Sequence, residues 1–223
     1  MSAQFSPEID GATLVLLGSF NPAIFQPAWF KSSDLLSGPE ADDAEVKIIH
    51  PAIAEFSTDW LQLSVIRDRF ALHTKSAAHF EQIQDLAVGV FHLLEHTPVT
   101  AMGLNRDMHF RIENEERWHA LGDRLAPKDI WSEKLRGIGT RDKPGLRSMT
   151  VMGYPPEKTN CLINVRVEPS ANIRPGLYVG CNRHYKIDDF QNSLKALMDE
   201  LAAAWVESLE YALEIARTIL EKA

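Results

Sequence analysis

Short apolar runs and longer amphipathic stretches alternate along this chain, and their spacing predicts both strands and helices. The continuous apolar run at 13–18 is typical of a buried strand. Further strands are predicted where β-branched and apolar residues concentrate, at 45–49, 60–74, 99–112, 146–152, 161–168 and 177–187. Helices are predicted at 23–36, 78–95, 113–121, around Trp131 and from about 188 to 222.

The order of these elements predicts the fold class. Strands joined by short turns, with helices between groups of strands, favour an α+β fold in which an antiparallel sheet carries helices on one face. We expect a single domain over 1–223 that ends in a long C-terminal helix. The sequence Gly-x-Asn-Arg occurs at 103–106 and again at 180–183, each time followed by a histidine and a helix. This echo suggests two pseudo-duplicated ferredoxin-like halves, at 11–112 and 113–223, with Arg106 and Arg183 equivalent and near strand ends.

Composition and charge narrow the classes of protein that this chain could be. Apolar residues make up 45% of it, enough for a core. The net charge of −8, without a run of basic residues interleaved with aromatics, disfavours nucleic-acid binding. Two cysteines are too few for a secreted disulfide scaffold, and residues 1–10 lack the features of a signal peptide. No apolar run approaches the ~20 residues that span a bilayer, so we expect a cytoplasmic protein without membrane contact.

Four segments carry a resemblance to a known family. They are HTPVTAMGLNRDMHF at 96–110, WHALGDRLAPKDIW at 118–131, VEPS at 167–170 and GCNRHY at 180–185. Together they resemble a bacterial family of uncharacterised, sporadically distributed hypothetical proteins, over about 20–185. The resemblance implies no activity, cofactor or catalytic residue. Sporadic distribution would suit a gene carried on mobile or defence-type elements.

One short motif has the spacing of a zinc site. His92, Glu95 and His96 fit H-x-x-E-H, in which two histidines on one helix turn bind zinc and the glutamate acts as base; Glu168 would be the distal ligand. The helical wheel argues against this site, because both histidines lie opposite the apolar side of the helix. We favour solvent-exposed, metal-free histidines. Motifs for phosphate, dinucleotide or nucleophile-elbow chemistry are absent, so no cofactor is predicted.

Alternation along three strands predicts a shared polar face. If the strands at 99–112, 161–168 and 177–187 are neighbours, one side of them gathers Asn105, His109, Asn164, Arg166, Glu168, Asn182 and His184. Two interpretations are open: a ligand-binding surface with acid–base groups, or a hydrated sheet face, which we favour. Both cysteines, Cys161 and Cys181, fall on apolar faces and are expected to be inert.

Arg106 and Arg183 fall on the apolar sides of their strands. We favour two matched bends that hold internal ion pairs over two arginines presented to an anionic ligand or a protein. Trp118 and Trp131 flank a charged segment, and there we favour buried tryptophans over an exposed recognition loop.

These patterns favour a non-enzymatic binding or assembly protein, as a subunit of a larger complex of the defence or mobile-element type. The alternative is a small-molecule-binding domain or a zinc-assisted hydrolase that uses the H-x-x-E-H motif or the polar strand faces. We expect the C-terminal helix, about 50 Å long, to dock a protein partner or a second copy. Its last turns would otherwise leave apolar residues uncovered, namely Leu213, Ile215, Ile219 and Leu220.

Overall fold

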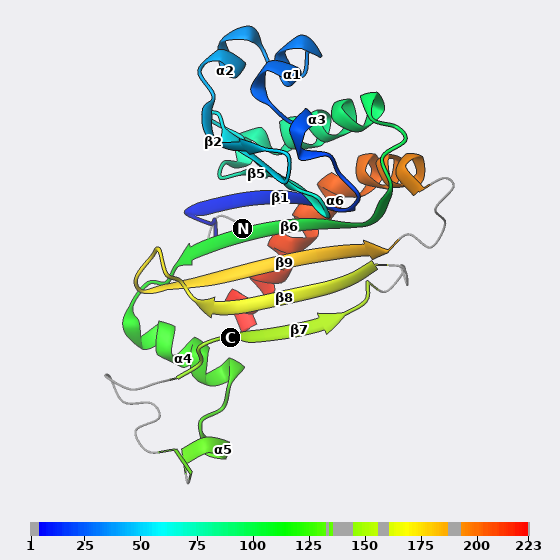
Figure 1. Cartoon of the computed structure of the whole chain (residues 1–223). Coiled ribbons are helices and arrows are strands. Elements are labelled where there is room, and N and C mark those ends of the chain that lie inside the picture. Colours follow the sequence, from blue (N-terminus) through cyan, green and yellow to red (C-terminus); the bar gives the residue numbers. More distant parts are fainter. Residues whose placement is uncertain (1–4, 133, 136–144, 156–160, 187–192, 223) are drawn as a thin grey trace.

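One antiparallel sheet organises the molecule (Figure 1). The computed structural model describes residues 5–132, 134–135, 145–155, 161–186 and 193–222. Within them the order of strands across the sheet is β2-β3-β4-β5-β1-β6-β9-β8-β7. Their bounds are β1 Ile9–Gly18, β2 Glu45–His50, β3 Ile53–Ser57, β4 Gln62–Ile66, β5 Arg69–Thr74, β6 Val99–Arg111, β7 Met149–Gly153, β8 Cys161–Pro169 and β9 Gly176–Lys186. The predicted α+β class is confirmed.

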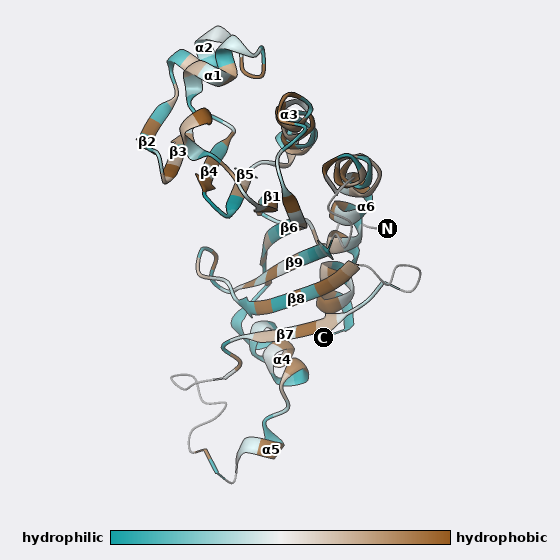
Figure 2. Cartoon of the chain, turned by 45° about the vertical axis from the view of Figure 1, so that its right-hand side comes forward, coloured by the Kyte–Doolittle hydropathy of each residue, from teal (hydrophilic) through white to brown (hydrophobic). Residues whose placement is uncertain are grey.

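Two helices cover one face of this sheet, as predicted. They are α3 (Phe80–Leu93) and α6 (Ser193–Lys222), which lie on the same side in Figure 2. Trp205 of α6 is fully buried, and its Nε1 donates a hydrogen bond to the carbonyl of Phe80 at 2.9 Å. The shorter elements are η1 (Pro22–Ile24), α1 (Pro27–Ser32), α2 (Gly38–Asp42), η2 (Ala77–His79), α4 (Glu115–Leu125) and α5 (Asp129–Ser132).

The C-terminal helix packs on its own sheet along its length. The buried residues of α6 recur at spacings of three and four, which gives one continuous stripe: Leu194, Leu197, Leu201, Ala204, Trp205, Leu209, Ala212, Ala216 and Leu220. Leu213, Ile215 and Ile219 are half-buried and contact the same core. The expectation that the last turns of this helix leave apolar residues uncovered for a partner is therefore wrong, because those residues pack on the protein's own core. The predicted start of this helix, at about 188, lies outside the described residues.

The first half of the chain contains more and shorter elements than its sequence predicts. The expected helix at 23–36 is divided into η1 and α1, because Pro22 and Pro27 each begin a new helical turn. The expected strand at 60–74 is the hairpin of β4 and β5, and β3 was missed. The turn between β4 and β5 consists of Arg67 and Asp68, which carry none of the usual glycine or asparagine signal.

The two Gly-x-Asn-Arg segments lie side by side on neighbouring strands. In the β6–β9 pairing Asn105 is directly opposite Asn182, and the register runs unbroken from Ala101 to Arg111. The expected bends are therefore absent from this pairing, and both arginines lie within their strands rather than at the ends. The local twofold of this antiparallel pair relates Arg106 to Arg183. The duplication of halves is not confirmed.

Candidate functional site: the open face of the sheet

The face of the sheet opposite α3 and α6 carries a row of polar side chains that crosses seven strands. Directly paired residues share a face, so the register places these side chains next to one another. We call them the polar row: Ser57, Gln62, His73, Thr13, Asn105, Asn182 and Asn164, from β3 across to β8. Strands are about 4.8 Å apart, so the row spans roughly 30 Å.

Hydrogen bonds hold the centre of the polar row in one conformation. Asn182 donates from Nδ2 to Oδ1 of Asn105 at 2.7 Å, and Asn105 donates to the carbonyl of Thr13 at 3.1 Å. On the other side of the centre, Thr13 Oγ1 lies 2.9 Å from Nδ1 of His73. Since these groups are half-buried and already ordered, a ligand that contacts them loses little of their side-chain entropy.

A second group of bonded residues adjoins the polar row. Tyr178 lies over Gly180, where an added Cβ would come within 2.8 Å of its Cζ. Its hydroxyl donates to Asp107 and accepts from Nη2 of Arg166 at 3.1 Å. Burial of Tyr178, together with the hydrogen bond to Asp107, raises the pKa of its phenol to about 12. At neutral pH this tyrosine is therefore a fixed donor and not a base.

Three histidines on this face are held towards their neutral forms. Burial lowers the pKa of His73 and of His109, in both cases against the charge of Asp107. Burial also lowers the pKa of His184, and Lys186 acts in the same direction. Neutral imidazoles can donate and accept hydrogen bonds, so these residues suit recognition of uncharged polar groups.

The open face is hollowed at its β3–β5 end. A cleft of about 410 Å³ lies over strands β1 to β5 and includes Thr13, Ser64, Arg69, Ala71 and His73. Its wall carries the ion pair between Lys47 and Glu55, at 2.7 Å. The volume lies within the range of small-molecule sites.

The structure brings together the polar residues that alternation predicted. Asn105, His109, Asn164, Arg166, Glu168, Asn182 and His184 all lie on the open face, because β6, β9 and β8 are consecutive neighbours. The prediction missed further residues of the same face, among them Ser57, Gln62, Thr13, His73, Asp107 and Tyr178. Alternation from Asn105 marks Asp107, and alternation from Asn182 marks Tyr178. No pattern within the segments of β1 and β5 indicated that these strands lie beside β6 and extend the same face.

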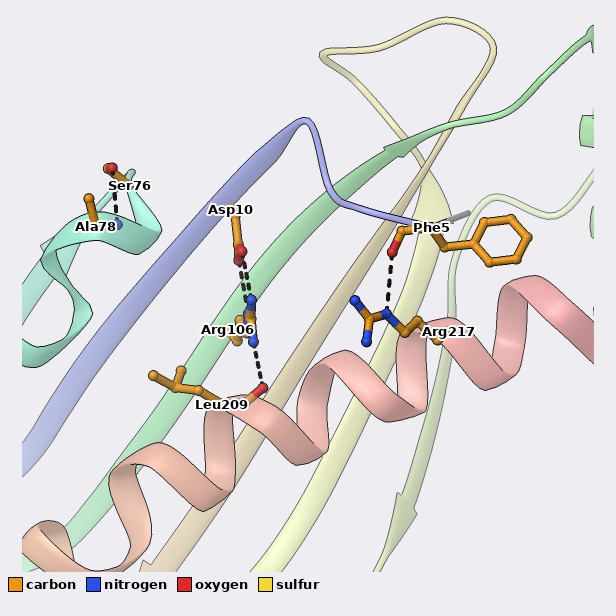
Figure 3. A network of polar contacts seen from close by, with 7 residues as sticks. All are labelled: Phe5, Asp10, Ser76, Ala78, Arg106, Leu209 and Arg217. Atoms are coloured by element: carbon orange, nitrogen blue, oxygen red, sulfur yellow. Dashed lines mark hydrogen bonds and ion pairs between the residues drawn. The ribbon is translucent and has the colours of Figure 1, made fainter. Parts of the chain in front are cut away.

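Arg106 lies on the helix-covered side and is not available to a ligand on the open face. Its guanidinium forms two bonds to Asp10, at 2.9 and 2.6 Å, and a third to the carbonyl of Leu209 at 2.7 Å (Figure 3). The side chains of Arg106 and Asp10 are 9% and 15% exposed. The predicted internal ion pair is therefore confirmed for Arg106. Because Arg106 faces the helices, its position does not support the predicted role in ligand binding.

Arg183 occupies a matching position one strand away. It is 2% exposed and donates to Ser208 at 2.9 Å and to Glu207 at 3.0 Å, both on α6. Both arginines therefore attach the sheet to its own C-terminal helix. The cysteines are buried on this side as well, and burial raises the pKa of Cys181 to about 11, which agrees with an inert thiol.

The residues of the H-x-x-E-H motif do not converge on Glu168. His92 and His96 are exposed, as predicted, and so is Glu95; Glu95 and His96 lie beyond the end of α3. Glu168 is on β8, where it accepts from Ser148 at 2.8 Å. Among the described residues, no group of three or more histidine, cysteine or acidic side chains is placed to hold a metal ion.

Comparison with protein-family models gives no match for this chain, and curated proteins give none either. The resemblance to sporadically distributed bacterial proteins therefore stays a prediction. In the part of the chain that the structure describes, every helix is too short or too polar to cross a bilayer.

Proposed function

We propose that this chain is a non-enzymatic binding protein that recognises a protein partner, within a larger assembly, through the open face of its sheet. The observation that carries this proposal is the polar row, a continuous set of hydrogen-bonding side chains that α3 and α6 leave uncovered. Its central members are ordered by their own contacts before any ligand arrives, which reduces the entropy lost on binding.

The chemistry of the face favours binding over catalysis. The buried thiols lie on the opposite side of the sheet, and the most perturbed open-face group, Tyr178, is held protonated. The hydroxyl, amide and neutral imidazole groups of the open face suit a partner whose surface is polar but uncharged. A protein meets this description better than a phosphate backbone does. A net charge of −8 acts in the same direction. The expected role in a defence or mobile-element complex rests on the resemblance alone.

The test compares one variant of the open face with one on the helix-covered side. The tagged full chain is expressed in its source cells, and its co-purifying proteins are quantified for wild type, Asn164→Trp and Val206→Trp. Asn164 is half-buried in the polar row, whereas Val206 is 51% exposed on α6. A partner that is lost with Asn164→Trp and kept with Val206→Trp supports the proposal. Equal recovery with both variants, at unchanged melting temperature, contradicts it.

A second candidate, small-molecule binding, is favoured by the cleft over β1 to β5. Arg69 lies in this cleft, and no ion pair of its guanidinium is found within the described residues. The carboxylate of a ligand in the cleft could therefore pair with this guanidinium. The same cleft also contains hydroxyl and imidazole groups, including those of Thr13 and His73. Gluconate, a polyhydroxy carboxylate, is a suitable probe.

NMR titration tests this candidate. Saturable shifts of cleft resonances with gluconate, weakened by Arg69→Gln and unchanged by Arg67→Gln in the adjacent turn, would favour it. No saturable shift up to about 50 mM, which corresponds to a binding free energy weaker than about 2 kcal/mol, would exclude this probe class.

A further inference from the structure

The two edges of the sheet differ in how they are protected. Strand β2 carries Glu45 and Lys47, and its register with β3 shifts between Val46 and Ile48. Charged side chains and bulges are the usual means by which proteins prevent an edge from pairing with another chain. The β2 edge is therefore protected against pairing.

Strand β7 lacks these protections. Its sequence is Met149-Thr150-Val151-Met152-Gly153, and the register with β8 is regular from end to end. No charge occurs from 148 to 156, although charged residues make up 24% of the chain. Within the described part of the chain β8 is the only strand that pairs with β7, so no described strand occupies the outer row of its backbone groups.

Both surfaces of β7 expose apolar side chains. Val151, on the side of α3 and α6, is 55% exposed, and Met152, on the open face, is 68% exposed. Tyr154, just after the strand, is 66% exposed. Such residues on a regular, uncharged edge are costly in a monomer, because they invite non-specific association.

We infer that β7 pairs with β7 of a second copy of this chain, antiparallel about a twofold axis at Val151. In this register Val151 opposes its own counterpart, Thr150 opposes the Met152 position, and Met149 opposes the Gly153 position. No charge meets a like charge, although each chain carries a net −8 that opposes self-association elsewhere. The two open faces become one surface across the dimer.

A five-residue strand alone buries less than a stable interface needs, which is about 800 Å² per partner. Helix α5 and Leu135, which follows it, offer further apolar area, since Ile130, Trp131 and Leu135 are 68%, 48% and 52% exposed. Helix α5 projects beyond β7 from the body of the molecule in both views (Figures 1 and 2). The expectation that Trp131 is buried is therefore wrong. Trp118, in contrast, is half-buried, and its Nε1 donates to the carbonyl of Gly176 at 2.9 Å.

The mass of the full chain in solution tests the dimer. Sedimentation equilibrium from about 1 to 100 μM should give a dimer for wild type and a monomer for Val151→Lys, because two ammonium groups would then face each other across the axis. Val206→Lys places the same charge on a residue of similar exposure, on α6, and should remain dimeric. Unchanged circular dichroism shows that each variant is folded. A monomeric wild type throughout this range, or a dimeric Val151→Lys, overturns the inference.

Cross-linking tests the register. Opposed residues in antiparallel strands have Cβ atoms about 4.5–5.5 Å apart, so Val151→Cys should form an intersubunit disulfide under mild oxidation. Thr150→Cys should cross-link at least tenfold more slowly, since its counterpart is displaced along the strand. The native cysteines are buried and serve as internal negative controls. Faster cross-linking at Thr150 than at Val151 would refute the proposed axis even if the dimer exists.

Discussion

Burial determines how much an ion pair contributes to stability, and two ion pairs between β6 and the segment 8–10 allow a comparison. Arg106 forms a two-bond pair with Asp10, and Arg111 forms another with Glu8, at 2.6 and 3.0 Å. The geometry is similar in both. In the first pair the side chains are 9% and 15% exposed, and in the second they are 54% and 43% exposed.

We predict that Asp10→Ala destabilises the protein by about 3–5 kcal/mol, because it leaves a buried guanidinium without its carboxylate. The remaining partners of Arg106 are the Leu209 carbonyl and the ring of Phe80, 5.3 Å from Cζ. Neither supplies a negative charge. The loss is a large part of the ~5–15 kcal/mol that stabilises most domains.

The double variant Asp10→Ala/Arg106→Met should regain much of the lost stability. The buried charge is then absent, and an apolar side chain of similar length fills the space of the arginine. Glu8→Ala should shift unfolding several-fold less than Asp10→Ala, because solvent screens the exposed pair. Urea unfolding followed by circular dichroism measures all four proteins, and a shift of about 1–2 M in midpoint is expected for Asp10→Ala. Equal shifts for Asp10→Ala and Glu8→Ala would refute the argument from burial.

Three further predictions concern the open face and the helix behind the sheet. Gly180→Ala should displace Tyr178 and lower the phenol pKa from about 12 towards 10, measured by ultraviolet titration; an unchanged titration would show that the ring does not depend on Gly180. Because burial holds the pKa of His73 below its unfolded value, the unfolded state takes up more protons, and stability should fall as pH decreases below about 6.5. His73→Gln should flatten this fall in the urea midpoint between pH 7.5 and 5.5, and a slope equal to wild type would count against it. Leu220→Ala should cost about 2–4 kcal/mol in urea unfolding, since the side chain is 2% exposed, while exposed Val206→Ala should cost little; similar costs would show that the end of α6 is not part of the core.

Period-two alternation determined the faces of β6, β8 and β9 from the sequence alone. Side chains of a strand point alternately to its two sides whatever its neighbours are. For this reason the sequence correctly separated Asn105 from Arg106 and Asn182 from Arg183. The amphipathic spacing of α3 and α6 likewise marked their buried sides, because helical geometry is also local.

The tertiary structure alone decided which strands became neighbours. β1 lies between β5 and β6, and this placement brings Thr13 and His73 into the polar row and Asp10 to Arg106, 96 residues away. It also placed the end of α6 on its own sheet and left β7 at an edge. Such pairings depend on the packing energy of the whole core and not on any local period. Local patterns therefore showed which side each residue faces, whereas only the assembled sheet showed what each residue meets there.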